Sequence, residues 1–347
     1  MKKIVICGGH LTPALALIEY LRSKKDYQII FFGRKTATEG IKNSSVEFKV
    51  INSLVIPFVS ITTGRMQRKF TRFTLTSLAK IPIGFIQSLY YLAKIKPALI
   101  VSFGGYLSTP VVVSGWLLGI DSISHEQAVV PGLATKINSL FCRKVFLTWK
   151  TSQKYFDGHK FVVIGNLTRK ALFARVAKDP KINQFVQKLQ KVIFITGGNQ
   201  GSHFLNQLTF KILPKLKNYS VIHQVGTTNW KGDLEQAKKI KNSNYLAVDY
   251  LESDNIGAVL NRADLVISRS GANTIWDLAI LAKVAILVPL PITAGDEQEA
   301  NAQILQAAGS SKVLNQGDLT TNELRSVIDQ MFDNLPNYQI RATAFAK

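Results

Sequence analysis

The sequence predicts an α/β protein with two doubly wound domains, each built on a parallel sheet. Short apolar runs typical of strands alternate with helical patterns along the chain, and this alternation indicates βαβ units. The pattern begins again near "FVVIGNLTRKALF", so we place a domain boundary at residues 163–168. Glycines follow several strands directly, where parallel sheets bind ligands. These three observations predict two domains with ligand-binding turns.

The expected strands of the first domain are "KIVIC", "YQIIFFG", "PALIVSFGG", "DSISHE" and "KVFLTW". Those of the second are "KVIFITGG", "YSVIHQVG", "NYLAVDYL", "ADLVISRSG" and "KVAILVPLP". Helical patterns lie between them, and the stretch after Leu319 is expected to be a helical tail. We divide the chain into domains 1–164 and 165–347. The tail after about residue 330 is a candidate to pack back on the first domain.

Four glycine turns are expected on the ligand-binding rims of the two sheets: Gly8-Gly9, Gly104-Gly105, Gly197-Gly198 with Gly201, and Gly271. A glycine between a strand and a helix lets backbone amides approach a phosphate at the helix N-terminus. The first turn, in "ICGGHLTPALA", lacks the dinucleotide fingerprint G-x-G-x-x-G. A helix is expected to begin there at about Thr12-Pro13, with proline near its first position.

The composition indicates a globular protein with an anionic partner. The formal net charge is +21, of which residues 1–165 carry +15 and residues 166–347 carry +6. Nucleic acid, an anionic membrane surface and a phosphorylated substrate are the candidate targets. Cys7 and Cys142 stand in apolar surroundings and are expected to be reduced core residues. We expect no signal peptide and no transmembrane segment, and therefore a cytoplasmic protein.

Seven collinear motifs resemble those of the MurG family: "GGHLTPALA", "SFGGYLSTP", "HEQAVVPGLATK", "GNLTRKALF", "GGNQGSHFLNQ", "ISRSGANTIWDLA" and "DEQEANAQIL". The resemblance covers residues 4 to about 318. It implies the GT-B architecture, two Rossmann-like domains facing a cleft. It also implies a hexosyltransferase that moves N-acetylglucosamine from its UDP donor to undecaprenyl-pyrophosphoryl-N-acetylmuramoyl-pentapeptide, the lipid I to lipid II step of peptidoglycan synthesis.

The resemblance implies that the second domain holds the UDP donor. The residues carried over are Arg169, Asn199, Gln200, Gly201, Leu251, Ser270, Gly271, Ala272, Asn273, Thr274, Asp277, Gln298 and Asn301. Asp277 stands where the family has a glutamate for the ribose hydroxyls, and Gln298 matches a glutamine that binds the sugar hydroxyls. The backbone at Leu251 is expected to read the uracil edge. The alternative to a donor-binding role for Arg169 is a solvated arginine at the start of a helix. Asp296 is expected to be a helix cap.

The acceptor and its diphosphate are assigned by the same resemblance to the first domain, at Gly8, Gly9, His10, Gly104, Gly105 and Tyr106. The family's first turn is GGTGGH, so "CGGH" is a shortened anion site. His10 is either the general base that takes the acceptor's proton or a residue that shapes the loop. Glu126 is either a second candidate for the catalytic role or a structural hydrogen-bond partner of its loop. Ala128 and Asn199 are further departures from the family motifs.

A basic and apolar segment of the first domain predicts contact with an anionic membrane surface, and the resemblance implies that this surface is the inner membrane face. Its candidate residues are Arg65, Arg68, Lys69, Phe70, Arg72, Phe73 and Leu75, whereas Phe85, Leu89 and Leu92 are expected in the core. Such a surface places apolar side chains in the headgroup boundary and cations near anionic lipid. Nucleic-acid binding is the rival explanation of the charge, but the sequence contains no recognised motif for it.

The sequence therefore predicts an inverting glycosyltransferase at the cytoplasmic face of the cell membrane, peripheral rather than membrane-spanning. Its partners are expected to be UDP-N-acetylglucosamine, the undecaprenyl-linked acceptor and an anionic membrane surface, without nucleic acid. No cofactor is expected, and no carboxylates show metal-ligand spacing. A divalent cation from solution that bridges the phosphates remains an alternative. Two alternatives remain: a related GT-B transferase with another lipid acceptor, and a weakly active membrane-bound scaffold.

Overall fold

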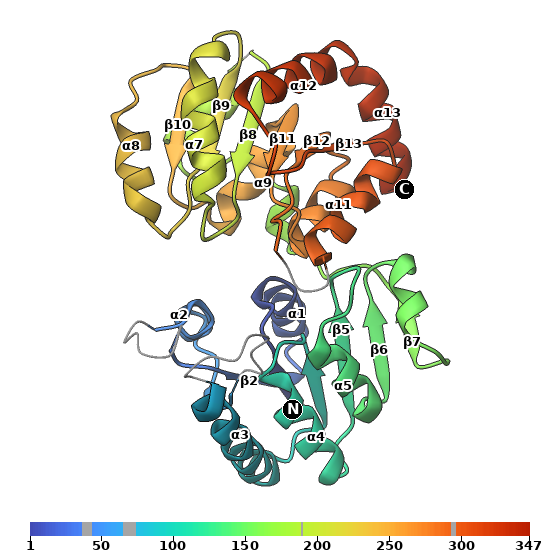
Figure 1. The fold of residues 1–347 in the computed structure, drawn as a ribbon. Coiled ribbons are helices and arrows are strands. Elements are labelled where there is room, and N and C mark those ends of the chain that lie inside the picture. Colours follow the sequence, from blue (N-terminus) through green and yellow to red (C-terminus); the bar gives the residue numbers. More distant parts are fainter. Residues whose placement is uncertain (37–43, 65–73, 189, 293–295) are drawn as a thin grey trace. The chain divides into compact units, whose positions relative to one another are not determined.

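The structure is a computed structural model that describes residues 1–36, 44–64, 74–188, 190–292 and 296–347. The chain forms two compact units, Met1–Arg169 and Lys170–Lys347. Each unit contains one sheet in which every strand pair is parallel, and helices cover both faces (Figure 1). The predicted α/β class with two doubly wound domains is confirmed.

The first sheet has seven strands in the order β3-β2-β1-β4-β5-β6-β7. The strands and helices of this unit are β1 (Lys2–Cys7), α1 (Leu11–Lys24), β2 (Tyr27–Gly33), α2 (Val46–Ser53), β3 (Phe58–Ser60), α3 (Thr74–Ile95), β4 (Leu99–Ser102), α4 (Ser108–Leu117), β5 (Ser122–Glu126), α5 (Leu133–Phe141), β6 (Lys144–Leu147), the 3-10 helix η1 (Lys150–Tyr155) and β7 (Phe161–Val163).

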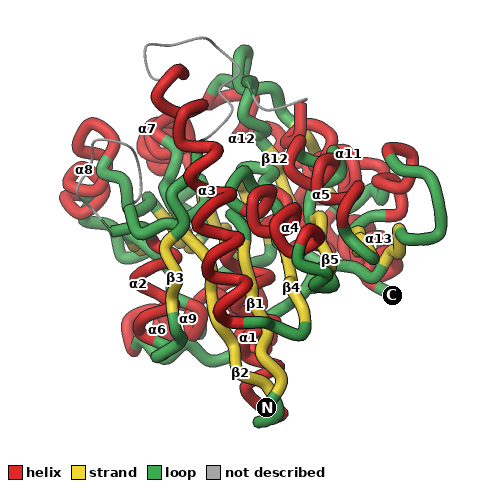
Figure 2. Tube along the Cα trace, turned by 90° about the horizontal axis from the view of Figure 1, so that it is seen from below, coloured by secondary structure: helices red, strands yellow, loops and turns green. Residues whose placement is uncertain are grey.

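Two layers of helices enclose this sheet. Helices α1 and α2 bury Ile18 and Ile51 against one face of the strands, and α3 and α4 bury Leu92 and Val111 against the other. Figure 2 shows α3 and α4 crossing the same side of β1 and β4. The alternation of residues between the two cores explains why β1, with Ile4 and Ile6 on one side and Val5 and Cys7 on the other, is apolar throughout.

The second sheet has six strands in the order β10-β9-β8-β11-β12-β13. Its unit contains η2 (Lys170–Phe173), α6 (Pro180–Val186), β8 (Val192–Thr196), α7 (His203–Ile212), η3 (Leu213–Lys215), β9 (Ser220–Gln224), η4 (Trp230–Gly232), α8 (Asp233–Lys239), β10 (Tyr245–Val248), α9 (Ser253–Arg262), β11 (Leu265–Ser268), α10 (Ala272–Ile280), β12 (Ala285–Leu287), α11 (Glu297–Ala307), β13 (Ser311–Val313), α12 (Thr321–Asp333) and α13 (Leu335–Ala346).

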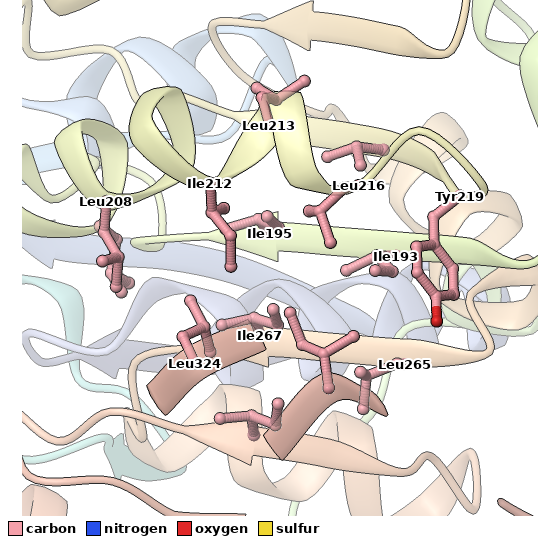
Figure 3. Close-up of a cluster of buried hydrophobic side chains, with 14 of the residues drawn as sticks. Ile193, Ile195, Leu208, Ile212, Leu213, Leu216, Tyr219, Leu265, Ile267 and Leu324 are labelled. Atoms are coloured by element: carbon pink, nitrogen blue, oxygen red, sulfur yellow. The ribbon is translucent and has the colours of Figure 1, made fainter. Parts of the chain in front are cut away.

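A large apolar core lies between this sheet and the helices α7 and α12. Ile195 and Ile267 of the central strands meet Ile212 of α7 and Leu324 of α12 (Figure 3). The helical tail after Leu319 is α12 and α13, and α13 contacts α10 and α12 of its own unit. The tail therefore has packing partners within the second unit.

Three strands differ from the sequence-based expectation. Strands β3, β7 and β13 were not expected as members of the sheets, and each has only three residues at a sheet edge. The run "FVV", which stands at the restart of the pattern near the expected boundary, is the last strand of the first sheet. So short a strand carries too little periodicity to distinguish it from a loop.

The strand orders indicate where ligands are expected to bind. In both sheets the order reverses between the first strand and the fourth: between β1 and β4, and between β8 and β11. Ligands of doubly wound sheets bind at such switch points, beyond the carboxyl ends of the strands. The four glycine turns predicted from the sequence follow these four strands.

Candidate functional site

The turn between β8 and α7 is held in place by very close backbone packing. Gly201 has a φ of +81°, and a Cβ added to it would lie 2.0 Å from the carbonyl oxygen of Val225. Gly226, in the same neighbouring turn, would place a Cβ 2.2 Å from the Cα of Gly201. Only glycine allows two backbones to approach so closely. The turn after β9 therefore fixes the path of the turn after β8.

Three carbonyls of this turn accept hydrogen bonds from the end of β9 and the turn that follows it. Gln224 Nε2 donates to the carbonyl oxygen of Gly198 at 3.0 Å, the Thr227 amide donates to that of Asn199 at 2.9 Å, and Thr228 to that of Gln200 at 3.3 Å. In the described chain the amides of Asn199 and Gln200 have no hydrogen-bond partner. Amides exposed in this way at a helix N-terminus are suited to a diphosphate.

The turn between β11 and α10 carries the second group of residues predicted to bind the donor. Gly271 is the N-cap of α10 and has no side chain to cap the first-turn amides, which begin at Ala272. Ser270 lies behind them: its hydroxyl donates to the carbonyl of Gln298 at 2.8 Å, and its own carbonyl accepts from Asn301 Nδ2 at 3.2 Å. The uncapped N-terminus of α10 favours an anion.

Gln298 and Asn301 differ in what they can contact. Gln298 is partly exposed, and its Oε1 accepts from the amide of Leu290 at 3.0 Å, which orients the side chain. Asn301 is fully buried and holds Ser270, so its described contact is with the loop and not with solvent. Thr274 and Asp277 follow on the first turns of α10 and are partly exposed, as is Asn273. Asn199 and Gln200 are exposed.

A buried arginine that was not selected from the sequence connects the turn after β8 with segments that follow β11 and β12. Arg269 donates to the carbonyls of Val288 and Pro289, and to the side-chain oxygens of Ser202 and Gln316 at 2.8 and 2.6 Å. All four acceptors are neutral. Burial lowers the pKa of Arg269 to about 10, so the side chain remains protonated at pH 7. This positive charge stands next to the N-cap of α7 and favours an anionic ligand.

A buried polar network supports the two neighbouring turns from behind. Asn206 Nδ2 donates to the carbonyl of Val225 at 3.1 Å and to Asp233 at 2.8 Å, so its Oδ1 accepts from His223 Nε2 at 3.0 Å. His223 Nδ1 accepts from the hydroxyl of Tyr245 at 2.9 Å. Burial lowers the pKa of His223 to about 3, which keeps this ring neutral. The network links α7, β9 and α8.

The backbone at Leu251 has a partner in the structure. Its amide donates to Gln224 Oε1 at 3.2 Å, and both residues are buried. The same Gln224 holds Gly198, so one side chain connects the expected uracil-reading segment with the phosphate turn. Gln224 was missed because a glutamine at the end of a strand gives no signal in the sequence.

Asp296 is the N-cap residue of α11, but its side chain makes no cap hydrogen bond, so the expected cap is wrong.

In the first unit the turns after β1 and β4 pack on each other. The amide of Gly9 donates to the carbonyl of Gly104 at 3.0 Å, and a Cβ on Gly8 would lie 2.8 Å from the backbone of Phe103. Gly105 has a φ of +76° and would place a Cβ 2.9 Å from the amide nitrogen of Gly9. The predicted acceptor residues Gly8, Gly9, His10, Gly104, Gly105 and Tyr106 thus form one assembly at the switch point of the first sheet.

His10 is half-buried at the start of α1, which begins at Leu11, one residue before the expected position. It occupies the N-cap position, but its side chain does not cap the helix. Burial and the neighbouring His125 lower the pKa of His10 to about 4. His125 itself donates from Nε2 to the carbonyl of Gly165 at 2.9 Å. The imidazole of His10 is therefore neutral at pH 7, the state that a general base needs, while the lowered pKa makes it a weaker base than an ordinary histidine.

Glu126 is buried at the end of β5 and holds the loop that leads to α5. One carboxylate oxygen accepts from the amide of Ala128 at 3.1 Å and the other from that of Gly132 at 3.2 Å. This geometry gives Glu126 a positioning role in the loop, and its catalytic role stays a hypothesis.

Arg169, which is predicted to bind the donor, is the last residue of the first unit and is partly exposed.

Several expectations concern membranes and metals. The candidate membrane residues from Arg65 to Phe73 lie outside the described residues, and Leu75 lies in the first turn of α3, where only the backbone is described. Leu92 is buried, as expected, while Phe85 and Leu89 are half-buried. Among the described residues no group of three His, Cys, Asp or Glu side chains has a metal-binding arrangement. Cys7 and Cys142 are buried free thiols.

Comparison with known proteins defines the class first. Residues 7–147 match the glycosyltransferase family 28 N-terminal domain, and residues 192–347 match the glycosyltransferase family 28 C-terminal domain. The protein is thus a family 28 glycosyltransferase, an enzyme class in which both matched domains occur in the order found here.

Relatives over the whole chain then define the family. A UDP-N-acetylglucosamine--N-acetylmuramyl-(pentapeptide) pyrophosphoryl-undecaprenol N-acetylglucosamine transferase of Clostridium kluyveri is 34% identical over 92% of this chain and 88% of its own length. One from Borreliella afzelii is 31% identical over 93% and 85%. The crystal structure of Acinetobacter baumannii MurG covers 100% of this chain and 96% of its own, with a TM-score of 0.71 at 22% identity. The chain belongs to the MurG family.

Proposed function

We propose that the protein transfers N-acetylglucosamine from UDP-N-acetylglucosamine to undecaprenyl-pyrophosphoryl-N-acetylmuramoyl-pentapeptide, with inversion at the anomeric carbon. Its membership of the family supports this proposal. The observation that carries it is the turn after β8, whose carbonyls are bound by the neighbouring turn while the amides of Asn199 and Gln200 have no partner in the described chain. Such a turn is suited to a diphosphate.

The proposal divides the roles among the predicted site residues. Asp277 binds the ribose hydroxyls, Gln298 the sugar hydroxyls, and the amides of the two glycine turns the diphosphate. The acceptor hydroxyl attacks the anomeric carbon from the face opposite UDP, and the bond from that carbon to the diphosphate oxygen breaks. His10 takes the hydroxyl proton. The N-terminus of α10 and the charge of Arg269 stabilise the negative charge that develops on UDP.

The proposal is tested by UDP release from UDP-N-acetylglucosamine, with purified protein in detergent and with or without the undecaprenyl-linked muramoyl-pentapeptide. We expect release that depends on this acceptor. Release only with another acceptor, such as diacylglycerol, would assign the protein to a related transferase. Donor binding without release under any of these conditions would contradict an enzyme and favour the scaffold.

We further propose that the outer surface of α3, α4 and α5 contacts the anionic inner membrane face, with the protein peripheral on the cytoplasmic side. These adjacent helices carry exposed apolar side chains, namely Ile83, Ile86, Tyr90, Trp116, Leu117 and Leu140. Trp116 of α4 stacks edge-on against Phe141 of α5, with ring centroids 5.3 Å apart. Lys94, Lys136 and Lys144 are exposed cations of the same helices and the following strand. Apolar residues among cations are typical of an interfacial surface.

None of the helices in the described ranges has both the length and the apolar character needed to cross a bilayer. Membrane attachment through α3, α4 and α5 would therefore depend on individual interfacial side chains.

The variant Trp116→Ser is expected to weaken binding to vesicles that contain phosphatidylglycerol. Trp116 is 55% exposed, and burial of about half of an aromatic side chain contributes about 1.5 kcal/mol, which corresponds to a roughly tenfold change in partition. Tyr20→Ser is the matched control, because Tyr20 is 59% exposed on α1 and faces away from α3 and α4. Equal binding of both variants in a vesicle sedimentation assay would show that Trp116 is not part of the membrane-binding surface.

A further inference from the structure

Arg34 is a cation of the first unit that neither the sequence analysis nor the roles given above include. It follows β2 directly, and its side chain is 42% exposed. Nη1 donates to the hydroxyl of Tyr106 at 3.2 Å, and Nε donates to Glu47 Oε1, also at 3.2 Å. Glu47 belongs to α2 and is largely buried, so it holds the plane of the guanidinium in one orientation.

The sheet order places this side chain at the candidate acceptor turn. Strands β2 and β4 are the two neighbours of β1, so a hydrogen bond from Arg34, after β2, to Tyr106, after β4, must pass across the end of β1. The Gly8–His10 turn lies at that end. Tyr106 follows Gly105, whose backbone is in contact with Gly9. The guanidinium therefore stands on the rim of the turn.

The remaining donors of Arg34 are suited to an anion. A guanidinium has five N–H groups, and Tyr106 and Glu47 use two of them. In the described part of the chain, Nη2 has no hydrogen-bond partner. Two N–H groups on one side of a fixed, half-exposed guanidinium match the geometry of two phosphate oxygens. The amide of Gly9 is already bound to the carbonyl of Gly104, so this donor is taken, and Arg34 adds a cation beside the turn.

We propose that Arg34 binds the diphosphate of the lipid-linked acceptor and sets the enzyme's preference for an acceptor that carries this group. This inference rests on the proposed function, since it names the part of the acceptor that the first unit reads. Tyr106 and Glu47 are positioning residues, which hold the guanidinium toward the turn. A purely structural ion pair between β2 and α2 would not depend on the charge of the ligand.

The kinetic test compares two acceptors, the diphosphate-linked muramoyl-pentapeptide and an O-alkyl analogue without phosphate. Arg34→Gln is expected to raise KM for the first about 10- to 100-fold, as for the loss of charge-assisted hydrogen bonds, and to change KM for the second less than about twofold. KM for UDP-N-acetylglucosamine should not change. Lys35→Gln is the matched control, because it removes one positive charge from the neighbouring residue, which is exposed. An equal increase for both acceptors, or no increase, would overturn the proposal.

A binding measurement separates this inference from the proposed function. Citronellyl diphosphate is titrated onto the full-length protein in saturating UDP, which occupies the other anion site. We expect Arg34→Gln, but not Lys35→Gln, to weaken binding at least about tenfold. This result would stand even if the wild-type protein released no UDP in the transfer assay. Unchanged binding in Arg34→Gln would refute the assignment while acceptor-dependent UDP release remained intact.

Discussion

His10→Ala is expected to lower kcat by about 10²- to 10⁴-fold, the usual contribution of a general base, while KM for UDP-N-acetylglucosamine stays unchanged. His10 stands in the turn after β1, packed against the turn after β4, at the switch point where a ligand of the first sheet binds. Initial rates of UDP release in detergent provide the measurement. His159→Ala is the control, because His159 is exposed in a loop of the same unit.

A second variant separates the two roles of His10. Glutamine has nearly the same reach and can donate and accept hydrogen bonds, but it does not take up a proton at neutral pH. If His10 is the base, His10→Gln should be as slow as His10→Ala. If His10 only shapes the loop, His10→Gln should recover most of the activity, and the catalytic assignment would be wrong.

The pH dependence of kcat/KM gives an independent result. A base must be unprotonated to act, and the pKa of His10 is lowered from 6.5 to about 4 by burial and by His125. Activity should therefore persist through pH 6.5 and fall only as the pH approaches about 4. A loss of activity centred near 6.5 would contradict the environment described for this histidine.

The fold was predictable because its signals are local. Most strands are apolar runs such as "KIVIC", and an α-helix follows most of them, so parallel sheets follow from the pattern alone. The glycines at positions 8, 104, 197 and 271 marked the carboxyl ends of the four strands that flank the two switch points. The short edge strands, the run "FVV" among them, carried no such signal.

The contacts behind the donor turn were not predictable, since they depend on which strands become neighbours. Arg269 reaches Ser202 across 67 residues, and Asn206 reaches Asp233 across 27. Nothing in the sequence indicates that either of these two residue pairs is in contact. Helical spacing correctly placed Gln298 and Asn301 one turn apart on α11, but it does not say which side chain faces the sheet. Asn301 is buried against the Ser270 loop, whereas Gln298 is partly exposed.

The donor turn itself is where we expect the largest loss of stability and of donor binding. Gly201→Ala would place a methyl group 2.0 Å from the carbonyl oxygen of Val225, and it would also force alanine to a φ of +81°. Left-handed backbone costs about 1–2 kcal/mol, and the overlap with a second backbone adds to it. The atoms that the methyl group would meet belong to the backbone, so they cannot rotate away as a side chain could. The turns after β8 and β9 must therefore separate. We expect the free energy of unfolding to fall by about 3 kcal/mol or more.

Gly198→Ala isolates the contribution of the close approach. Gly198 has a φ of +83°, nearly the value of Gly201, but a Cβ added there meets nothing within 4 Å. The control therefore carries the left-handed cost without the overlap. Urea denaturation and calorimetric titration with UDP would measure both variants. If the fixed spacing of the two turns holds the Asn199 and Gln200 amides toward the diphosphate, Gly201→Ala should lose both stability and UDP affinity, and Gly198→Ala only a smaller part of each. Equal losses would show that backbone conformation alone, and not the contact with Val225, organises the site.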